Sequence, residues 1–154
     1  MRIGNFSQDF VRQITKLAGP VVLLFCISTL AAAQKEATVH NFKSGTDGAF
    51  PTSSLIADSS GNLYGTTSEG GGSTNCSSGK TAVGCGTVYE LTPPGNGVNT
   101  WTETILYAFQ GGKTDGAGPN AALIFDGTGN LYGTTNGDGQ NNNGVIFELS
   151  PPSE

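Results

Sequence analysis

Charged side chains are scarce in this sequence. They make up 12% of the 154 residues, about half the usual share in globular proteins. The chain contains one histidine, one tryptophan and one methionine, and no arginine follows Arg12. A protein with so few bases cannot neutralise a run of phosphates, which argues against nucleic acid as a partner.

The residue sets that most enzymes need are also missing. His40 is the only histidine, and no base with an orienting third group stands ready to activate a serine or threonine. The run Gly70-Gly71-Gly72 is not followed by the Lys-Ser/Thr of a phosphate-binding loop. We therefore expect no enzyme activity, no cofactor and no metal site, and we read His40 as a packed or surface residue.

Glycine is abundant, with 24 residues, and serine, threonine and asparagine accompany it. This composition favours short strands and tight turns over helices. Disorder is the competing interpretation, but the large apolar residues cluster in regularly placed runs that can build a core.

Residues 1–34 have the pattern of an export signal. Basic residues precede the apolar run Leu17–Leu30, and Ala31-Ala32-Ala33 offers small residues for cleavage near Ala33. We expect a signal-peptide helix here, cleavage, and a secreted or cell-surface destination. A retained membrane anchor is the alternative, although the 17 residues Leu17–Ala33 include Pro20 and are short for ~30 Å of hydrocarbon.

Cleavage would leave an acidic chain. It would hold four lysines against eleven acidic residues, a net charge of −7. Acidic membrane surfaces would repel it, so we expect membrane contact only through an uncleaved signal.

Two cysteines remain after the signal, because Cys26 lies inside the apolar run. An even pair in an exported chain predicts a disulfide between Cys76 and Cys85. Zinc is the alternative, but two cysteines without nearby histidines or further cysteines make a poor zinc site.

An internal repeat organises the rest of the chain. Residues 46–67 and 114–135 are identical at 15 of 22 positions, without a gap and 68 residues apart. Both copies contain the signature Leu-Tyr-Gly-Thr-Thr. Its residues are Leu63, Tyr64, Gly65, Thr66 and Thr67, and then Leu131, Tyr132, Gly133, Thr134 and Thr135.

The pattern predicts eight strands in two sets of four. In each copy Asp-x-x-Gly-Asn forms a turn between two short apolar runs, which indicates a hairpin. The expected strands are 37–42, 55–57, 63–67, 86–91, 101–109, 123–125, 131–135 and 144–149. Apolar residues on both faces of 86–91 and 144–149 favour stacked sheets, as in propeller blades or solenoids.

We therefore expect an all-β protein with two four-stranded antiparallel repeat units that resemble blades of an incomplete β-propeller. The first unit spans residues 35–109 and carries the disulfide in an insertion loop at 68–85. The second, C-terminally truncated unit spans 110–154, where the corresponding loop is ten residues shorter.

These motifs resemble the exported tandem-repeat proteins called GloVer-repeat or choice-of-anchor proteins. The matching features are Leu63–Thr67, Gly86–Leu91 and Trp101–Phe109, and then Leu131–Thr135 and Gly144–Leu149. The resemblance covers nearly all of residues 39–152. It implies a secreted or surface β-repeat protein, propeller-like and of undefined biochemical role, and it brings no catalytic residues. Members carry many such units, whereas this chain has barely two.

Several polar residues have an alternative functional reading. Asp58 and Asp126 are a candidate glycosidase pair, but their equivalent positions favour local turns. Asp138 lies in an oxygen-rich loop that lacks the other acids of a calcium site, so we expect a solvated turn. Five aromatic residues are candidates for a sugar-binding surface, although strand aromatics more often pack in a core. They are Tyr64, Tyr89, Trp101, Tyr107 and Tyr132.

The sequence thus favours an exported, non-enzymatic β-repeat module that serves binding or surface structure. Its candidate partners are a carbohydrate or protein ligand, a second copy, or further repeat units. A fragment of a carbohydrate-active or carbohydrate-binding extracellular protein is the alternative function. A truncated gene product without independent function is the third hypothesis.

Overall fold

The computed structural model describes residues 34–97 and 99–151. Its contacts divide the chain into Met1–Glu36 and a compact unit from Ala37 onward, and the second is described here. The expected signal-peptide helix lies almost wholly outside the described residues. Within them, no helix is long and apolar enough to cross a bilayer.

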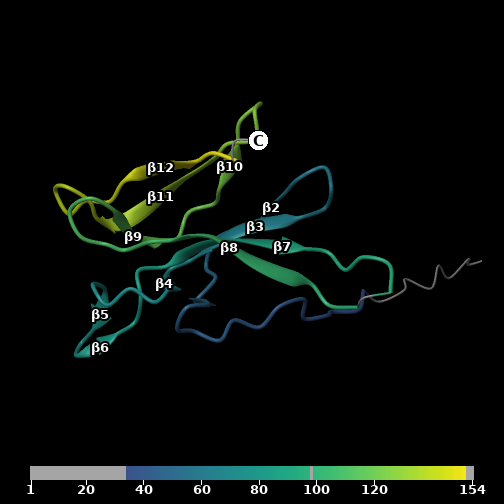
Figure 1. Cartoon of the computed structure of the whole chain (residues 1–154), viewed down its shortest axis with the longest axis horizontal. Coiled ribbons are helices and arrows are strands. Elements are labelled where there is room, and N and C mark those ends of the chain that lie inside the picture. The colour runs from purple at the N-terminus through teal and green to yellow at the C-terminus, as the bar shows by residue number, and fades with distance from the viewer. Residues whose placement is uncertain (1–33, 98, 152–154) are drawn as a thin grey trace, which may run out of the picture. The chain divides into compact units, whose positions relative to one another are not determined.

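The described residues form an all-β structure without a helix, as the sequence predicts (Figure 1). Twelve strands follow one another along this described part of the chain. They are β1 (Gly48–Ala49), β2 (Ile56–Ala57), β3 (Leu63–Thr67), β4 (Glu69–Gly70), β5 (Ser77–Ser78), β6 (Thr81–Ala82), β7 (Thr87–Thr92), β8 (Thr102–Ala108), β9 (Gly116–Pro119), β10 (Ile124–Phe125), β11 (Leu131–Asp138) and β12 (Ile146–Leu149).

The first sheet contains four antiparallel strands in the order β2-β3-β7-β8. Its central strand β7 is rich in β-branched and aromatic residues, which suit a strand with neighbours on both edges. Within the pair β7–β8 the register shifts between Val88 and Tyr89. Such a bulge increases the local twist.

The second sheet repeats this plan with one difference. Strands β10, β11 and β12 pair as β2, β3 and β7 do, and the register of Gly133 with Phe147 matches that of Gly65 with Tyr89. The fourth strand, β9, pairs with the far end of β11 instead of extending the sheet beyond β12. Both sheets are open.

Glycine-rich segments make the short additional pairs. β1 pairs with β4 through Gly48 and Gly70, and β9 pairs with β11 through the equivalent Gly116 and Asp138. The insertion that distinguishes the first unit folds into the hairpin β5–β6. These pairings were not predicted, because the segments lack the apolar alternation that signals a strand.

Apolar faces of the two sheets meet in one core. Its buried members are Cys85, Val88, Phe109, Leu123 and Leu131. Ring pairs extend this contact: Tyr64 of β3 lies 5.1 Å from Phe125 of β10, and Phe109 lies 5.1 Å from Phe147 of β12. Edge-to-face aromatic pairs at this distance stabilise packing beyond the area that they bury.

The prediction of a strand at residues 37–42 is wrong. This segment has no strand partner, and Figure 1 draws it without an arrow. Its side chains pack on the first sheet instead: Phe42 lies 5.0 Å from the ring of Tyr89, and His40 contacts Glu103. The predicted strands at 55–57, 63–67, 86–91, 101–109, 123–125, 131–135 and 144–149 correspond to strands with somewhat different ends.

Candidate functional site

The turn before the repeat signature is closed by hydrogen bonds to its aspartate, which also binds the signature tyrosine. Asp58 accepts hydrogen bonds from the backbone N–H of Ser60 and Asn62, from the Asn62 amide at 2.8 Å and from the Tyr64 hydroxyl at 3.1 Å. Gly61 has a φ of +84°, a conformation that suits glycine. The signature tyrosine therefore ties its strand to the turn before it.

The second copy repeats this turn. Asp126 accepts from the backbone N–H of Thr128 and Asn130, from the Asn130 amide at 2.7 Å and from the Tyr132 hydroxyl at 3.4 Å. Partial desolvation would raise the pKa of both aspartates. The hydrogen bonds outweigh it, those from Asn62 and Asn130 first, and hold both pKa values below the ordinary range. The predicted turn role of both aspartates is confirmed.

The glycine of the signature makes room for an aromatic ring on the next strand. A Cβ atom at Gly65 would lie 2.5 Å from the Tyr89 hydroxyl and 2.8 Å from Leu55. At Gly133 it would overlap Phe147 and lie 2.8 Å from Leu123. Only glycine lets the ring cross the strand this closely.

The second threonine of the signature joins neighbouring strands. The Thr67 hydroxyl lies 2.7 Å from that of Thr87, accepts the N–H of Thr87, and lies 2.8 Å from the carbonyl of Glu69. Thr135 likewise accepts the N–H of Val145 and donates to the carbonyl of Gly137. Both threonines are buried.

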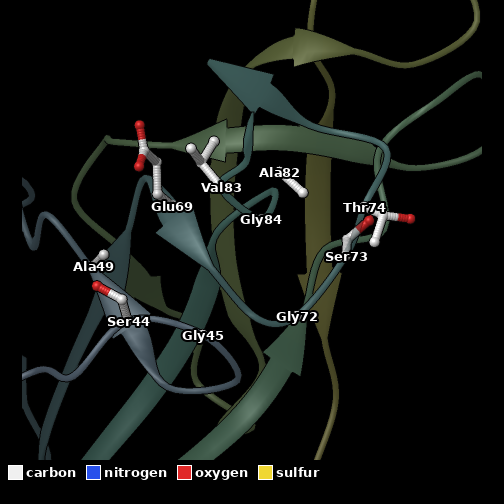
Figure 2. A pocket seen from close by; sticks show the side chains of 10 residues that line it. All are labelled: Ser44, Gly45, Ala49, Glu69, Gly72, Ser73, Thr74, Ala82, Val83 and Gly84. Atoms are coloured by element: carbon white, nitrogen blue, oxygen red, sulfur yellow. The ribbon is translucent and has the colours of Figure 1, made fainter. Parts of the chain in front are cut away.

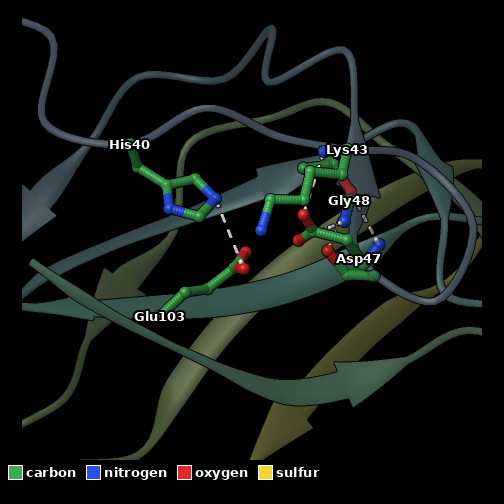
Figure 3. A network of polar contacts seen from close by, with 7 residues as sticks. His40, Lys43, Asp47, Gly48 and Glu103 are labelled. Atoms are coloured by element: carbon green, nitrogen blue, oxygen red, sulfur yellow. Dashed lines mark hydrogen bonds and ion pairs between the residues drawn. The ribbon is translucent and has the colours of Figure 1, made fainter.

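A cluster of three ionisable side chains lies on the first sheet (Figure 3). His40 Nε2 is 3.3 Å from Glu103 Oε2, and the two side chains are only 16% and 14% exposed. Asp47 completes the group, with one ligand-type atom of each residue within 4.8 Å of the others. Burial, then the hydrogen bond with Asp47 and its charge, raise the pKa of Glu103 to about 7.

These three donors are of the kind that a divalent cation takes, but Asp47 is already engaged. Its oxygens accept the backbone N–H groups of Lys43 and Gly48, both at 2.9 Å. In the second copy Asp115 accepts those of Gln110 and Gly116, and the Tyr107 hydroxyl stands in the place of His40. Loop closure therefore accounts for Asp47. Burial would raise its pKa, but the hydrogen bond with Glu103 first, and then these backbone bonds, lower it.

Sequence reasoning missed this cluster, because His40 and Glu103 lie far apart in the chain. The repeat contains one signal for it: Phe42 corresponds to Phe109, which aligns His40 with Tyr107 and indicates that the two residues occupy equivalent places.

A hollow of about 320 Å³ lies between the loop before β1 and the β4–β6 region (Figure 2). Its lining is mainly glycine, serine, threonine and alanine, with Glu69 as the charged member. These short side chains offer few anchoring groups to a ligand.

A second hollow of about 410 Å³ runs between the two sheets. Tyr64 and Phe125 contribute its aromatic lining, and Glu90 and Glu148 contribute equivalent carboxylates from β7 and β12. Of the five candidate sugar-binding aromatics, only Tyr64 lines this hollow. Tyr89 is buried, and Tyr107 bonds to Asp115. The predicted sugar-binding aromatics therefore do not form one continuous surface.

The candidate glycosidase pair does not form a shared site, because Asp58 and Asp126 each bond within their own turn. The other acids are engaged elsewhere: Asp115 bonds to Tyr107, and Glu103 belongs to the histidine cluster. Asp138 ends β11 with a φ of +60° and accepts the N–H of Gly112 at 2.8 Å. The exposed turn that the sequence predicts in this loop follows it at residues 140–143.

The disulfide joins Cys76 and Cys85, whose Cα atoms are 5.2 Å apart. Cys85 is buried in the shared core, and its carbonyl accepts the N–H of Gly118. Ser73 and Asn75 donate to the carbonyl of Gln110. The insertion is therefore fastened to the segment that connects the two sheets.

The family model of the Gloeobacter/Verrucomicrobia repeat matches residues 26–154. The chain belongs to this repeat family. The match contains both turns and both signatures described above, so the repeat family explains the internal duplication. No curated protein and no solved structure matches the chain.

Proposed function

We propose that this member of the repeat family is an exported, non-enzymatic β-repeat module that serves binding or surface structure. One observation carries the proposal: the signature residues serve the fold itself. The tyrosine closes the turn, the glycine accepts a neighbouring ring, and the second threonine joins two strands, in both copies alike. A module built this way leaves its loops and outer faces for partners.

Export is supported by two independent features. The sequence begins with a basic segment and an apolar run of the signal-peptide type. The paired cysteines Cys76 and Cys85 agree with an oxidising compartment, where such bonds persist. Both features support a secreted or cell-surface location.

We further propose that the two units are packed as blades of a propeller-like array. Twisted antiparallel sheets stack face to face, and the same ring pair, Phe42 with Tyr89 and Phe109 with Phe147, recurs at each unit. Propellers repeat such sheets around an axis, with four to eight blades.

Fractionation of a Gram-negative host that expresses the full chain tests export. We expect the wild type outside the cytoplasm, with an N-terminus near Gln34 by mass spectrometry. Replacing Leu23 and Leu24 by arginine should keep the chain in the cytoplasm, because charge in the apolar run blocks signal function. Leu106→Arg, the same change in the folded unit, should still be exported. A wild type retained in the cytoplasm with reduced cysteines would contradict the proposal.

Carbohydrate binding is the second candidate, favoured by the hollow that Tyr64 and Phe125 line together with Glu90 and Glu148. Aromatic faces beside carboxylates suit sugar rings with their apolar faces and hydroxyls. Calorimetric titration with soluble polysaccharides tests it, and Tyr64→Ala should abolish any binding seen. Release of sugar fragments by the wild type would contradict the non-enzymatic part of the first proposal.

A further inference from the structure

At the junction between the two sheets, one face of the first unit packs on the opposite face of the second unit. The first sheet contributes Val88 of β7, and the second contributes Leu123 from the segment before β10. Both side chains are buried in the shared core, with 0% and 1% of their surface exposed. Tyr64 and Phe125 pair beside them.

The repeat places the counterparts of these residues on the two outer faces. Ile146 of β12 is equivalent to Val88, and it is 81% exposed. Leu55 is equivalent to Leu123, and it is 47% exposed. Thr134 is exposed in the same way, whereas its counterpart Thr66 is buried. The outer face with Ile146 therefore corresponds to the face of the first sheet that is buried at the junction. The outer face with Leu55 corresponds to the face of the second sheet that is buried there, so the two outer faces are complementary.

The outer edge of β12 likewise lacks a partner strand among the described residues. Among residues 34–97 and 99–151, β12 pairs with β11 only, whereas the equivalent β7 pairs with β3 on one edge and with β8 on the other. A strand edge with free N–H and C=O groups is a template for another strand.

The segment Glu36–Phe42 has the sequence of such a strand. It aligns with Glu103–Phe109, with identical glutamate and phenylalanine at the ends, and Val39 and His40 stand opposite Leu106 and Tyr107. Within the described chain this segment belongs to no sheet.

The segment already holds the right position on its own unit. Phe109, just after β8, packs edge-to-face on Phe147 of the second sheet at 5.1 Å, while Phe42 packs in the same way on Tyr89 of the first at 5.0 Å. β8 pairs with β7 of the first sheet through its backbone, while Phe109 at its end packs on the second sheet. Residues 37–42 can likewise pair with another sheet through their backbone while Phe42 stays on the first sheet.

We propose that copies of this chain associate head to tail. Residues 37–42 of one copy pair with the free edge of β12 of another, as β8 pairs with β7. The face with Leu55 packs on the face with Ile146, which recreates the junction between the two units. The interface is heterologous, so assembly proceeds until a ring closes. The inference rests on the proposed role as a structural repeat module and adds its partner, a second copy.

Light scattering during gel filtration of the full chain, processed as the expressing cell processes it, tests the association. The wild type should have a mass of several copies. Ile146→Lys and Leu55→Lys should each reduce this mass, because each places a charge in the apolar contact. Since both residues are exposed in the single chain, each variant should keep a cooperative thermal melt. Ser78→Lys, which adds the same charge on the exposed β5–β6 hairpin, is the matched control and should assemble as the wild type does.

Mixing the two variants gives the decisive result. Ile146→Lys keeps the Leu55 face, and Leu55→Lys keeps the Ile146 face, so one intact junction can form between them. We expect a species of two copies that grows no further. A monomeric wild type up to its solubility limit, unchanged assembly of both variants, or a mixture that stays monomeric would each overturn the proposal. Export of a monomeric wild type would leave the proposed function standing.

Discussion

The hydroxyl groups of Thr67 and Thr87 lie 2.7 Å apart between β3 and β7, and both side chains are fully buried. The adjacent Thr66 is also buried, yet its hydroxyl oxygen has no hydrogen-bond partner among the described residues. Two neighbouring threonines thus have opposite roles, one binding the sheet together and one burying a polar atom at a cost.

Replacement of these threonines by valine should change stability in opposite directions. Thr67→Val leaves the N–H of Thr87 without its acceptor and should lower the free energy of unfolding by about 1–3 kcal/mol. Thr66→Val keeps the shape and removes an unpaired polar atom, so it should be neutral or stabilising. Denaturant unfolding of both variants measures the difference. Equal losses would contradict this assignment of the two roles.

Adding a methyl group to the signature glycine should loosen each unit. Gly65→Ala or Gly133→Ala forces the ring of Tyr89 or Phe147 away from its strand, and the overpacking should cost about 1–3 kcal/mol. Gly95→Ala is the control, because a Cβ atom there meets nothing within 4 Å. Chemical denaturation compares the three, and a Gly65 variant as stable as the Gly95 variant would refute the tight crossing.

Loss of the disulfide should weaken the fold without abolishing it. A double change of Cys76 and Cys85 to serine frees a loop of sequence separation 9. In the chain-entropy model this costs about 2.5–3 kcal/mol. Thermal melts of the variant and of the reduced wild type should shift downward alike. A melt that is independent of reductant would show that the bond contributes no stability.

Glu103 should make stability depend on pH. Its pKa is raised from the ordinary 4.5 to about 7, first by burial and then by Asp47, with His40 and Lys43 as its other ionisable neighbours. Folding therefore favours the protonated carboxyl. Its contribution is fully present below pH 4.5 and is lost as the pH rises to about 7. Glu103→Gln should flatten this fall.

Unfolding by urea across that window measures the effect. Glu148→Gln removes an exposed carboxylate and serves as the control, which should keep the slope of the wild type. An identical slope for Glu103→Gln would assign the pH dependence to other groups.

The sequence predicts the hairpins well, because local chemistry determines them. Asp58 and Asp126 bond the backbone two and four residues ahead, so the Asp-x-x-Gly-Asn pattern is sufficient to locate both turns. The strands beside them follow from apolar runs, and the cysteine pair follows from its count.

Pairings that depend on distant neighbours were not predictable. Gly48 and Gly70 pair through backbone alone, with no side chain to announce a strand. Residues 37–42 have strand-like alternation but no adjacent edge within the described chain. The meeting of His40, Asp47 and Glu103 depends on how that segment lies across β8, which is a matter of tertiary packing.

The bond between Cys76 and Cys85 also spans Lys80, one of the four lysines outside the N-terminal segment, at the tip of the β5–β6 hairpin. A trypsin-like protease that cuts after this lysine would sever the backbone and still leave one covalent molecule. The two pieces would migrate together on a gel and separate only once a thiol was added. The disulfide would therefore hold a module that is cut at this exposed tip together as one molecule.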